Sequence, residues 1–122
     1  MKKFLFVLLL VLLVSSPALF AQAQQDFTVV NKTGLAIANL FVSPAETNNW
    51  EEDVLGVDVL QNDEQVDIQF HPSEESCLWD IKIIDEEGDS VEWYKIDLCK
   101  ALVVALYWEN GEAWADVENV DE

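Results

Sequence analysis

Arginine is absent from this sequence of 122 residues, and histidine occurs only once. The six basic residues are all lysines and are outnumbered by 24 acidic residues, which gives a formal net charge of −18. Nucleic-acid binding depends on basic side chains that neutralise phosphates, so this composition excludes nucleic acid as a partner. It also excludes attraction to an anionic membrane surface. If charge guides association, we expect cationic partners, either metal ions or basic proteins. In the alternative interpretation, the acidity only keeps the domain soluble.

Residues suited to catalysis are also few. The single histidine, His71, precedes Pro72, and Ser73 and Ser76 follow without the pattern of an oxyanion hole. We therefore expect a solvated loop histidine rather than a member of a catalytic triad. The four glycines form no phosphate-binding loop, and carboxylate pairs are uninformative among 24 acidic residues. The sequence thus predicts a protein that is not an enzyme.

The only long hydrophobic run lies at the N-terminus. It covers positions 4–14, follows two lysines and is broken by serine and proline at 15–17. Ala21-Gln22-Ala23 then supplies the small residues that signal peptidase recognises. This order is typical of a secretory signal peptide, and the run is too short for a membrane span. We predict a signal peptide over 1–23, cleaved near Ala23, and a single exported acidic domain over 24–122, in the periplasm or the medium. The alternative is an uncleaved membrane anchor.

The sequence has only two cysteines, Cys77 and Cys99. Export would place them in an oxidising compartment. Gly88 lies midway between them, in the turn-forming stretch 85–89. A hairpin folded about this turn brings the cysteines together at its open end, so we predict a disulfide worth on the order of 3 kcal/mol. A metal site would need further thiol or histidine ligands, which the sequence lacks.

Short β-branched and aromatic segments separated by turn residues recur along the chain, which is typical of antiparallel β-structure. We predict an all-β antiparallel β-sandwich, or a small barrel, of about seven to eight short strands with one disulfide. Asn110-Gly111 is the strongest hairpin signal. Ile37 and Phe41 are expected on one face of their strand, with Leu40 and Val42 on the other, and 50–55 is expected to form one helical turn. The predicted strands cover 27–31, 35–43, 57–60, 65–70, 77–85, 90–98, 101–108 and 112–117.

Two acidic stretches are candidates for binding calcium, which takes oxygen ligands from loops. The first spans 46–58 and the second is the turn at 85–89. Neither has the spacing of an EF-hand, and solvated acidic loops are the alternative interpretation. No other cofactor is expected. The candidate ligands are Glu51, Glu52, Asp53 and Asp58, with Asn48 and Asn49 nearby, and Asp85, Glu87 and Asp89.

Five tryptophans are many for a domain of this size. Trp108 and Trp114 flank the Asn110-Gly111 turn. A tight two-residue loop would place Glu109 opposite Glu112 and Trp108 opposite Ala113, which leaves Trp114 diagonal to Trp108. If exposed together, they would form a platform for a sugar or a peptide. With Glu109 and Glu112 beside it, this platform would suit a basic partner. The alternative is that both tryptophans belong to the core.

Several segments together resemble a family of small secreted bacterial β domains. The segments are VVNKTG at 29–34, VSPA at 42–45, Trp50 with DVLG at 53–56, CLWDIK at 77–82 and IDLC at 96–99. The similarity covers most of the predicted domain. The family has no settled function, and the resemblance implies no catalytic residues. Some members bear the name argininosuccinate lyase, but that enzyme is much larger, helical and cytoplasmic, and none of its features is present in this sequence.

Three functional hypotheses follow from these observations. The first is a non-catalytic exported module that binds a ligand or partner of unknown identity. The second is a calcium-binding domain whose acidic loops become ordered around the ion. The third is an inhibitor of a basic secreted enzyme.

Overall fold

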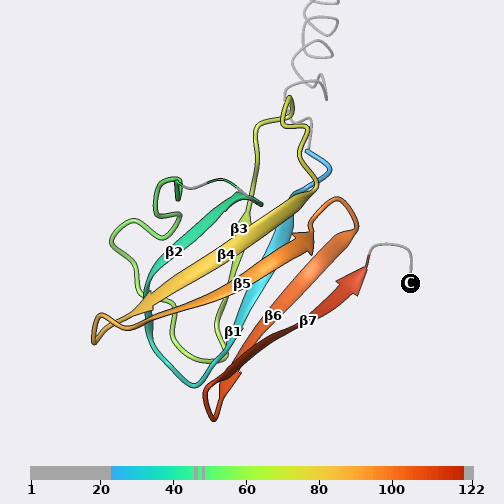
Figure 1. Cartoon of the computed structure of the whole chain (residues 1–122). Coiled ribbons are helices and arrows are strands. Elements are labelled where there is room, and N and C mark those ends of the chain that lie inside the picture. The colour runs from blue at the N-terminus through green and yellow to red at the C-terminus, as the bar shows by residue number, and fades with distance from the viewer. Residues whose placement is uncertain (1–22, 46, 48, 120–122) are drawn as a thin grey trace, which may run out of the picture.

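In the computed structural model, seven strands form two sheets packed face to face (Figure 1). The structure describes residues 23–45, 47 and 49–119. The all-β sandwich predicted from the sequence is confirmed. The predicted signal peptide lies outside the described residues except for Ala23, and within them no helix is long and apolar enough to cross a membrane. The strands are β1 (Phe27–Lys32), β2 (Ile37–Pro44), β3 (Gln65–Ile68), β4 (Leu78–Asp85), β5 (Ser90–Asp97), β6 (Ala101–Glu109) and β7 (Glu112–Asn119).

The two sheets have the strand orders β3-β1-β6-β7 and β2-β4-β5. Four of the strand pairs are antiparallel, as predicted, but β1 and β6 are parallel. This pair departs from a purely antiparallel sandwich because the chain, after placing β3 on one side of β1, passes to the other sheet for β4 and β5 and returns on the other side of β1 as β6. Periodicity within a strand carries no signal for such a distant pairing. The sheet therefore depends at its centre on contacts between the two ends of the domain.

The hydrophobic core lies between the sheets. Trp79, Ile81 and Ile83 of β4 share the inner face, as predicted, and are almost completely buried. The prediction for β2 was wrong in one respect. A β-bulge after Ile37 shifts the β2–β4 register, so that Ile37 is buried on the same side as Leu40 and Val42. Because a bulge adds one residue to the strand, the simple alternation read from the sequence is offset at this point.

The segment that follows β2 covers the free edge of that strand. The strand predicted at 57–60 is reduced to one isolated bridge between Ile37 and Leu60, and 50–55 is irregular, with bends at Val54 and Leu55, rather than helical. The segment is held by backbone hydrogen bonds to the edge of β2, including one from Val54 N–H to Leu40 O at 2.8 Å. Backbone pairing with an edge strand competes with a helical turn, which explains both differences. We call the side formed by the edges of β2 and β3 the covered side.

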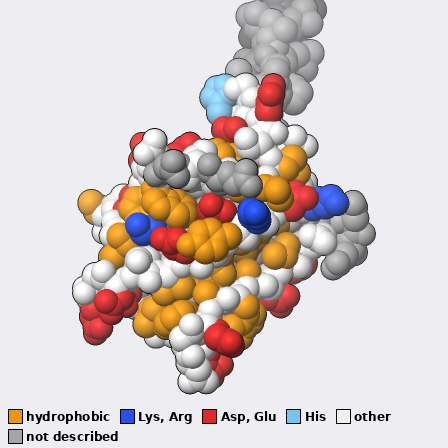
Figure 2. Space-filling model, viewed as in Figure 1, with side chains coloured by type: hydrophobic (Ala, Val, Ile, Leu, Met, Phe, Trp, Pro, Cys, Tyr) orange, Lys and Arg blue, Asp and Glu red, His pale blue; other side chains and the backbone are white. Residues whose placement is uncertain are grey.

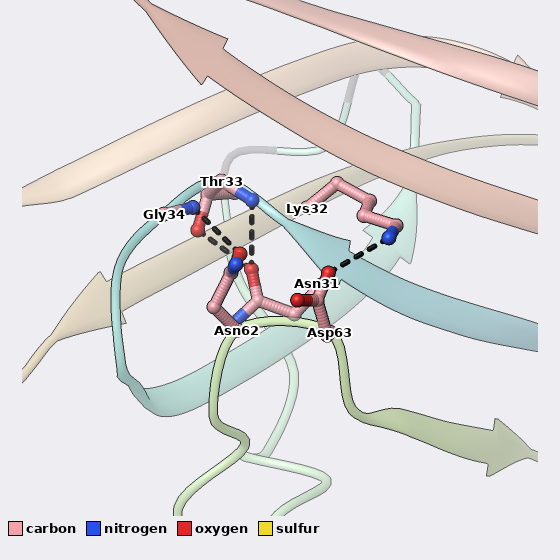
Figure 3. A network of polar contacts seen from close by, with 6 residues as sticks. All are labelled: Asn31, Lys32, Thr33, Gly34, Asn62 and Asp63. Carbon is pink, nitrogen blue, oxygen red and sulfur yellow. Dashed lines mark hydrogen bonds and ion pairs between the residues drawn. The ribbon is translucent and has the colours of Figure 1, made fainter.

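A buried asparagine anchors the chain turns on the covered side (Figure 3). Asn31 is fully buried, and its amide group donates to the carbonyl oxygens of Leu35 at 2.8 Å and Leu60 at 3.0 Å. Its side-chain oxygen accepts from the N–H and the hydroxyl of Thr33 at 3.0 and 2.6 Å. At the surface, Lys32 forms an ion pair of 2.7 Å with Asp63. These contacts fix the β1–β2 turn against the segment that leads into β3.

The disulfide predicted between Cys77 and Cys99 is present, with the two Cα atoms 5.0 Å apart. It closes the hairpin of β4 and β5, whose turn contains Gly88. The backbone N–H of Leu98 also donates to the carbonyl of Cys77 at 2.8 Å. The disulfide therefore connects the residue before β4 to the turn that leads into β6.

Candidate functional site

A groove of about 700 Å³ lies between β5 and β7, the strands at which both sheets end on the side opposite the covered side. We call it the β5–β7 groove, and this side of the molecule the open side. Figure 2 shows hydrophobic side chains exposed along the strip between these strands. Concave surfaces that expose apolar groups commonly mark binding sites. Its lining includes Trp93, Tyr94 and Ile96 of β5 and Ala113, Ala115 and Val117 of β7.

Trp93 links the two sheets at this groove. Its side chain is only 4% exposed, and the indole Nε1 donates to the carbonyl oxygen of Trp114 at 2.8 Å. The neighbours of Trp114 along β7 are Ala113 and Ala115, whose small side chains leave the backbone accessible to the indole. This hydrogen bond fixes the distance between β5 and β7, the edge strands of the two sheets on this side. The sequence analysis did not single out Trp93, because no local pattern indicates that β5 and β7 meet.

The β5 wall of the groove is interrupted by a bulge at Tyr94 and Lys95. The β4–β5 register shifts here, and Lys95 has a positive φ of 54°. The N–H of Lys95 donates to the carboxylate of Asp80 at 2.8 Å, which holds the bulge. Tyr94 is turned to solvent, with 62% of its surface exposed, and its hydroxyl donates to Glu92. This hydrogen bond raises the pKa of Tyr94.

The predicted register of the hairpin at Asn110-Gly111 is confirmed, but Trp108 and Trp114 lie on opposite faces of it and do not form one exposed platform. Trp108 is opposite Ala113 and packs against the core. Trp114 is opposite Tyr107 on the outer face, where the two rings stack with centroids 5.2 Å apart. Since adjacent residues of a strand point to opposite faces, the two-residue turn at Asn110-Gly111 determines this result. The aromatic pair on the outer face is therefore Tyr107, which is half-buried, and Trp114, which is exposed.

The outer face of β7 is acidic. Glu112, Asp116 and Glu118 alternate along it and are exposed, and Trp114 lies between the first two. The predicted site residues Glu109 and Glu112 are brought directly opposite each other by the hairpin. Like charges directly opposite each other destabilise a strand pair, so this end of the hairpin favours a cation close to it. The predicted acidic surrounding of Trp114 is thus present, although Trp108 is not part of it.

The first predicted calcium loop does not gather its carboxylates. Glu51, Glu52 and Asp58 are exposed, and within the described residues they form no cluster of metal-ligating groups. Asn49 is also exposed, and Asn48 lies outside the described residues. The loop runs along the edge of β2 rather than folding around a central point, so its side chains are spread along the strand.

Asp53 of this loop has a structural role in the covered side. Its carboxylate accepts hydrogen bonds from the N–H of Leu40 at 2.9 Å, the N–H of Leu55 at 3.0 Å and the side-chain amide of Asn39 at 2.8 Å. Burial by itself would raise the pKa of Asp53, but the three hydrogen bonds outweigh it and lower that pKa. The group is therefore a charged acceptor that attaches the loop to β2.

The second predicted loop does bring Asp85, Glu87 and Asp89 together, with ligand atoms within 4.8 Å of one another. Oδ1 of Asp85, however, accepts from the N–H groups of Glu87 and Asp89, each at 2.9 Å. Asp85 is buried, whereas Glu87 and Asp89 are exposed. This arrangement is that of an Asp side chain closing its own turn.

The single histidine lies in an exposed loop, as the sequence analysis expected. The hydroxyl oxygen of Ser73 is 2.7 Å from Nδ1 of His71, and the N–H of Ser73 donates to the same nitrogen at 3.1 Å. Two contacts to one nitrogen from a residue two positions away form a local turn. Within the described part of the chain, no carboxylate hydrogen-bonds to the other ring nitrogen, so the pair lacks the third group of a triad.

Comparison of the sequence with protein-family models, with curated proteins and with solved structures finds no match. The resemblance to small secreted bacterial domains therefore stays a prediction. The open side and the charge of the molecule are therefore the features that bear on its function.

Proposed function

We propose that this chain is a non-catalytic exported module that binds a basic protein partner at its open side. The β5–β7 groove carries the proposal, because it combines a groove of about 700 Å³ with exposed aromatic rings at its rim. Tyr94 and Trp114 are 62% and 43% exposed there, whereas most large hydrophobic residues of the domain are buried. Exposed aromatic residues at a groove are typical of interaction surfaces.

Charge supports a basic partner. All 24 acidic residues follow position 23, together with only four of the six lysines. The predicted mature domain thus has a strongly negative field, which accelerates encounters with cationic proteins and disfavours acidic ones. Inhibition of a basic secreted enzyme is one form that this interaction would take.

The proposal can be tested by immobilising residues 24–122 and passing exported proteins of the producing cell over them. A matched column carries the E112K/D116K/E118K variant, which reverses charge beside the groove. We expect the first column, but not the second, to retain a basic protein whose binding, measured again with both purified proteins, weakens as salt is raised. Retention of only acidic proteins, or of the same proteins by both columns, would contradict the proposal.

A further inference from the structure

The four sheet edges of this sandwich differ in their protection. Exposed edge strands readily pair with another chain unless they are short, bulged or covered. β2 is covered by the segment that contains Asp53 and Leu60, β3 has only four residues, and β5 is bulged at Tyr94 and Lys95. Within the described residues, β7 is the one edge that is both long and regular, because the irregularity in its pairing lies in β6 between Ala101 and Val103.

The backbone of β7 faces the groove. Backbone N–H and C=O groups alternate between the two edges of a strand, and β7 has β6 on one side only. Half of these groups are therefore directed toward the β5–β7 groove. Trp93 contacts one carbonyl of β7, that of Trp114, at its inner surface.

The side chains of β7 define what an added strand must carry. Its outer face presents Glu112, Asp116 and Glu118, and its groove face presents Ala113, Ala115 and Val117. A strand beside β7 continues the same alternation, so its outer side chains would meet carboxylates and its inner side chains would enter the groove beside Ala113, Ala115 and Val117. Lys95, in the bulge of β5, and Lys100, in the turn between β5 and β6, also line the groove.

We propose that β7 is a docking edge to which an extended segment of a basic partner adds as a fifth strand of the β3-β1-β6-β7 sheet. The segment alternates lysine or arginine with small apolar residues such as alanine and valine. A second copy of this chain does not fit, because the carboxylates of two β7 strands would face each other between two strongly acidic molecules. The inference rests on the proposed function and specifies how the partner is recognised.

Synthetic peptides of about nine residues, long enough to span β7, test this mode of binding to the domain 24–122. The first alternates lysine and valine, the second has the same composition in two blocks, and the third alternates aspartate and valine. Two further versions of the first peptide carry N-methyl groups on alternate residues, in either of the two registers. Binding is measured by titration, and amide chemical shifts report whether β7 is the contact.

We expect the alternating lysine peptide to bind about tenfold or more tightly than the block peptide, with shifts confined to β7 and the groove. N-methylation in the register that faces β7 should weaken binding about tenfold, and in the other register by less than about threefold, since only one edge of the peptide pairs. The E112K/D116K/E118K variant should prefer the aspartate peptide. The control variant E51K/E52K/D58K, with the same change in net charge, should behave like the unmodified domain.

The outcomes separate the two proposals. Strand addition at β7 would be overturned if the two N-methylated peptides bound equally, or if both charge variants lost the same affinity for the lysine peptide. Neither result would contradict binding of a basic partner by another mode. Equal affinity of the lysine and aspartate peptides, together with no basic protein retained by the domain, would overturn the proposed function itself.

Discussion

The covered side and the open side of this sandwich use the same kinds of residues for different purposes. On the covered side, polar groups are withdrawn from solvent and hydrogen-bonded, as with the buried Asn31 and the half-buried carboxylate of Asp53. On the open side, carboxylates and aromatic rings are exposed around a groove. The protein thus covers the edge of β2 with its own chain on one side and leaves a long edge strand, β7, accessible on the other. Composition alone therefore does not assign the acidic residues of this chain to a single role.

The largest effect is expected from breaking the anchor of the covered side. Replacing Asn31 with alanine removes four hydrogen bonds at a fully buried position. We expect the free energy of unfolding to fall by about 3 kcal/mol, because buried polar partners lose their hydrogen bonds. Denaturant unfolding measures the change. As a control, Asn62→Ala, which removes one exposed contact to Gly34, should cost less than about 1 kcal/mol. Similar losses in both variants would contradict a special role for Asn31.

A smaller effect is expected from Asp53→Ala, which removes the acceptor that attaches the loop to β2. We expect a loss of about 2 kcal/mol near neutral pH, since hydrogen bonds to a charged group are the stronger ones. Because the pKa of Asp53 is lowered in the folded state, its contribution is present above the unfolded pKa and disappears as pH falls through the folded pKa. The difference between the two proteins should therefore shrink below about pH 4, measured by unfolding across a pH series.

The matched control for this change is Glu52→Ala, an exposed neighbour in the same loop. It should alter stability by less than about 0.5 kcal/mol at any of these pH values. A stability difference for Asp53→Ala that does not change with pH would show that the carboxylate charge is not what holds the loop.

On the open side, Trp93→Phe removes the indole N–H that reaches Trp114 O. We expect a loss of about 1 to 2 kcal/mol from the hydrogen bond and the reduced packing, measured by thermal unfolding. Hydrogen exchange should increase in β5 and β7 but not on the covered side. Trp114→Phe is the control, because that indole is 43% exposed, and it should cost less than about 0.5 kcal/mol. Uniform acceleration of hydrogen exchange across the domain would contradict the prediction that Trp93 stabilises the open side alone.

The smallest effect is expected from calcium. Asp85 already accepts two backbone N–H groups in its turn, and the carboxylates of the other loop do not converge within the described residues. We therefore expect millimolar calcium to leave the melting temperature within about 1 °C of its value in chelator. A shift of several degrees that Glu87→Gln and Asp89→Asn together remove would instead support the calcium hypothesis for the hairpin turn.

Local features of this fold were predictable, and distant ones were not. The Asn110-Gly111 turn determined the pairing of Glu109 with Glu112, and the spacing about Gly88 located the disulfide. The bulge after Ile37 and the parallel neighbour of β1 depend on contacts with other strands, which a single strand's periodicity does not encode. The groove escaped prediction for the same reason, since β5 and β7 meet only in the assembled sandwich.

The parallel pairing of β1 with β6 also determines when this domain can fold. Thr28 finds its partner Val103 only after nearly the whole chain has been synthesised. Closing so long a loop is entropically costly, and folding slows as contacts become more distant in sequence. The hairpins can form early, but the β3-β1-β6-β7 sheet can be completed only when its last two strands, β6 and β7, are available. A chain truncated before β6 would keep the strands of the β2-β4-β5 sheet and its disulfide hairpin, but it would lack half of the β3-β1-β6-β7 sheet that covers the other face of the core.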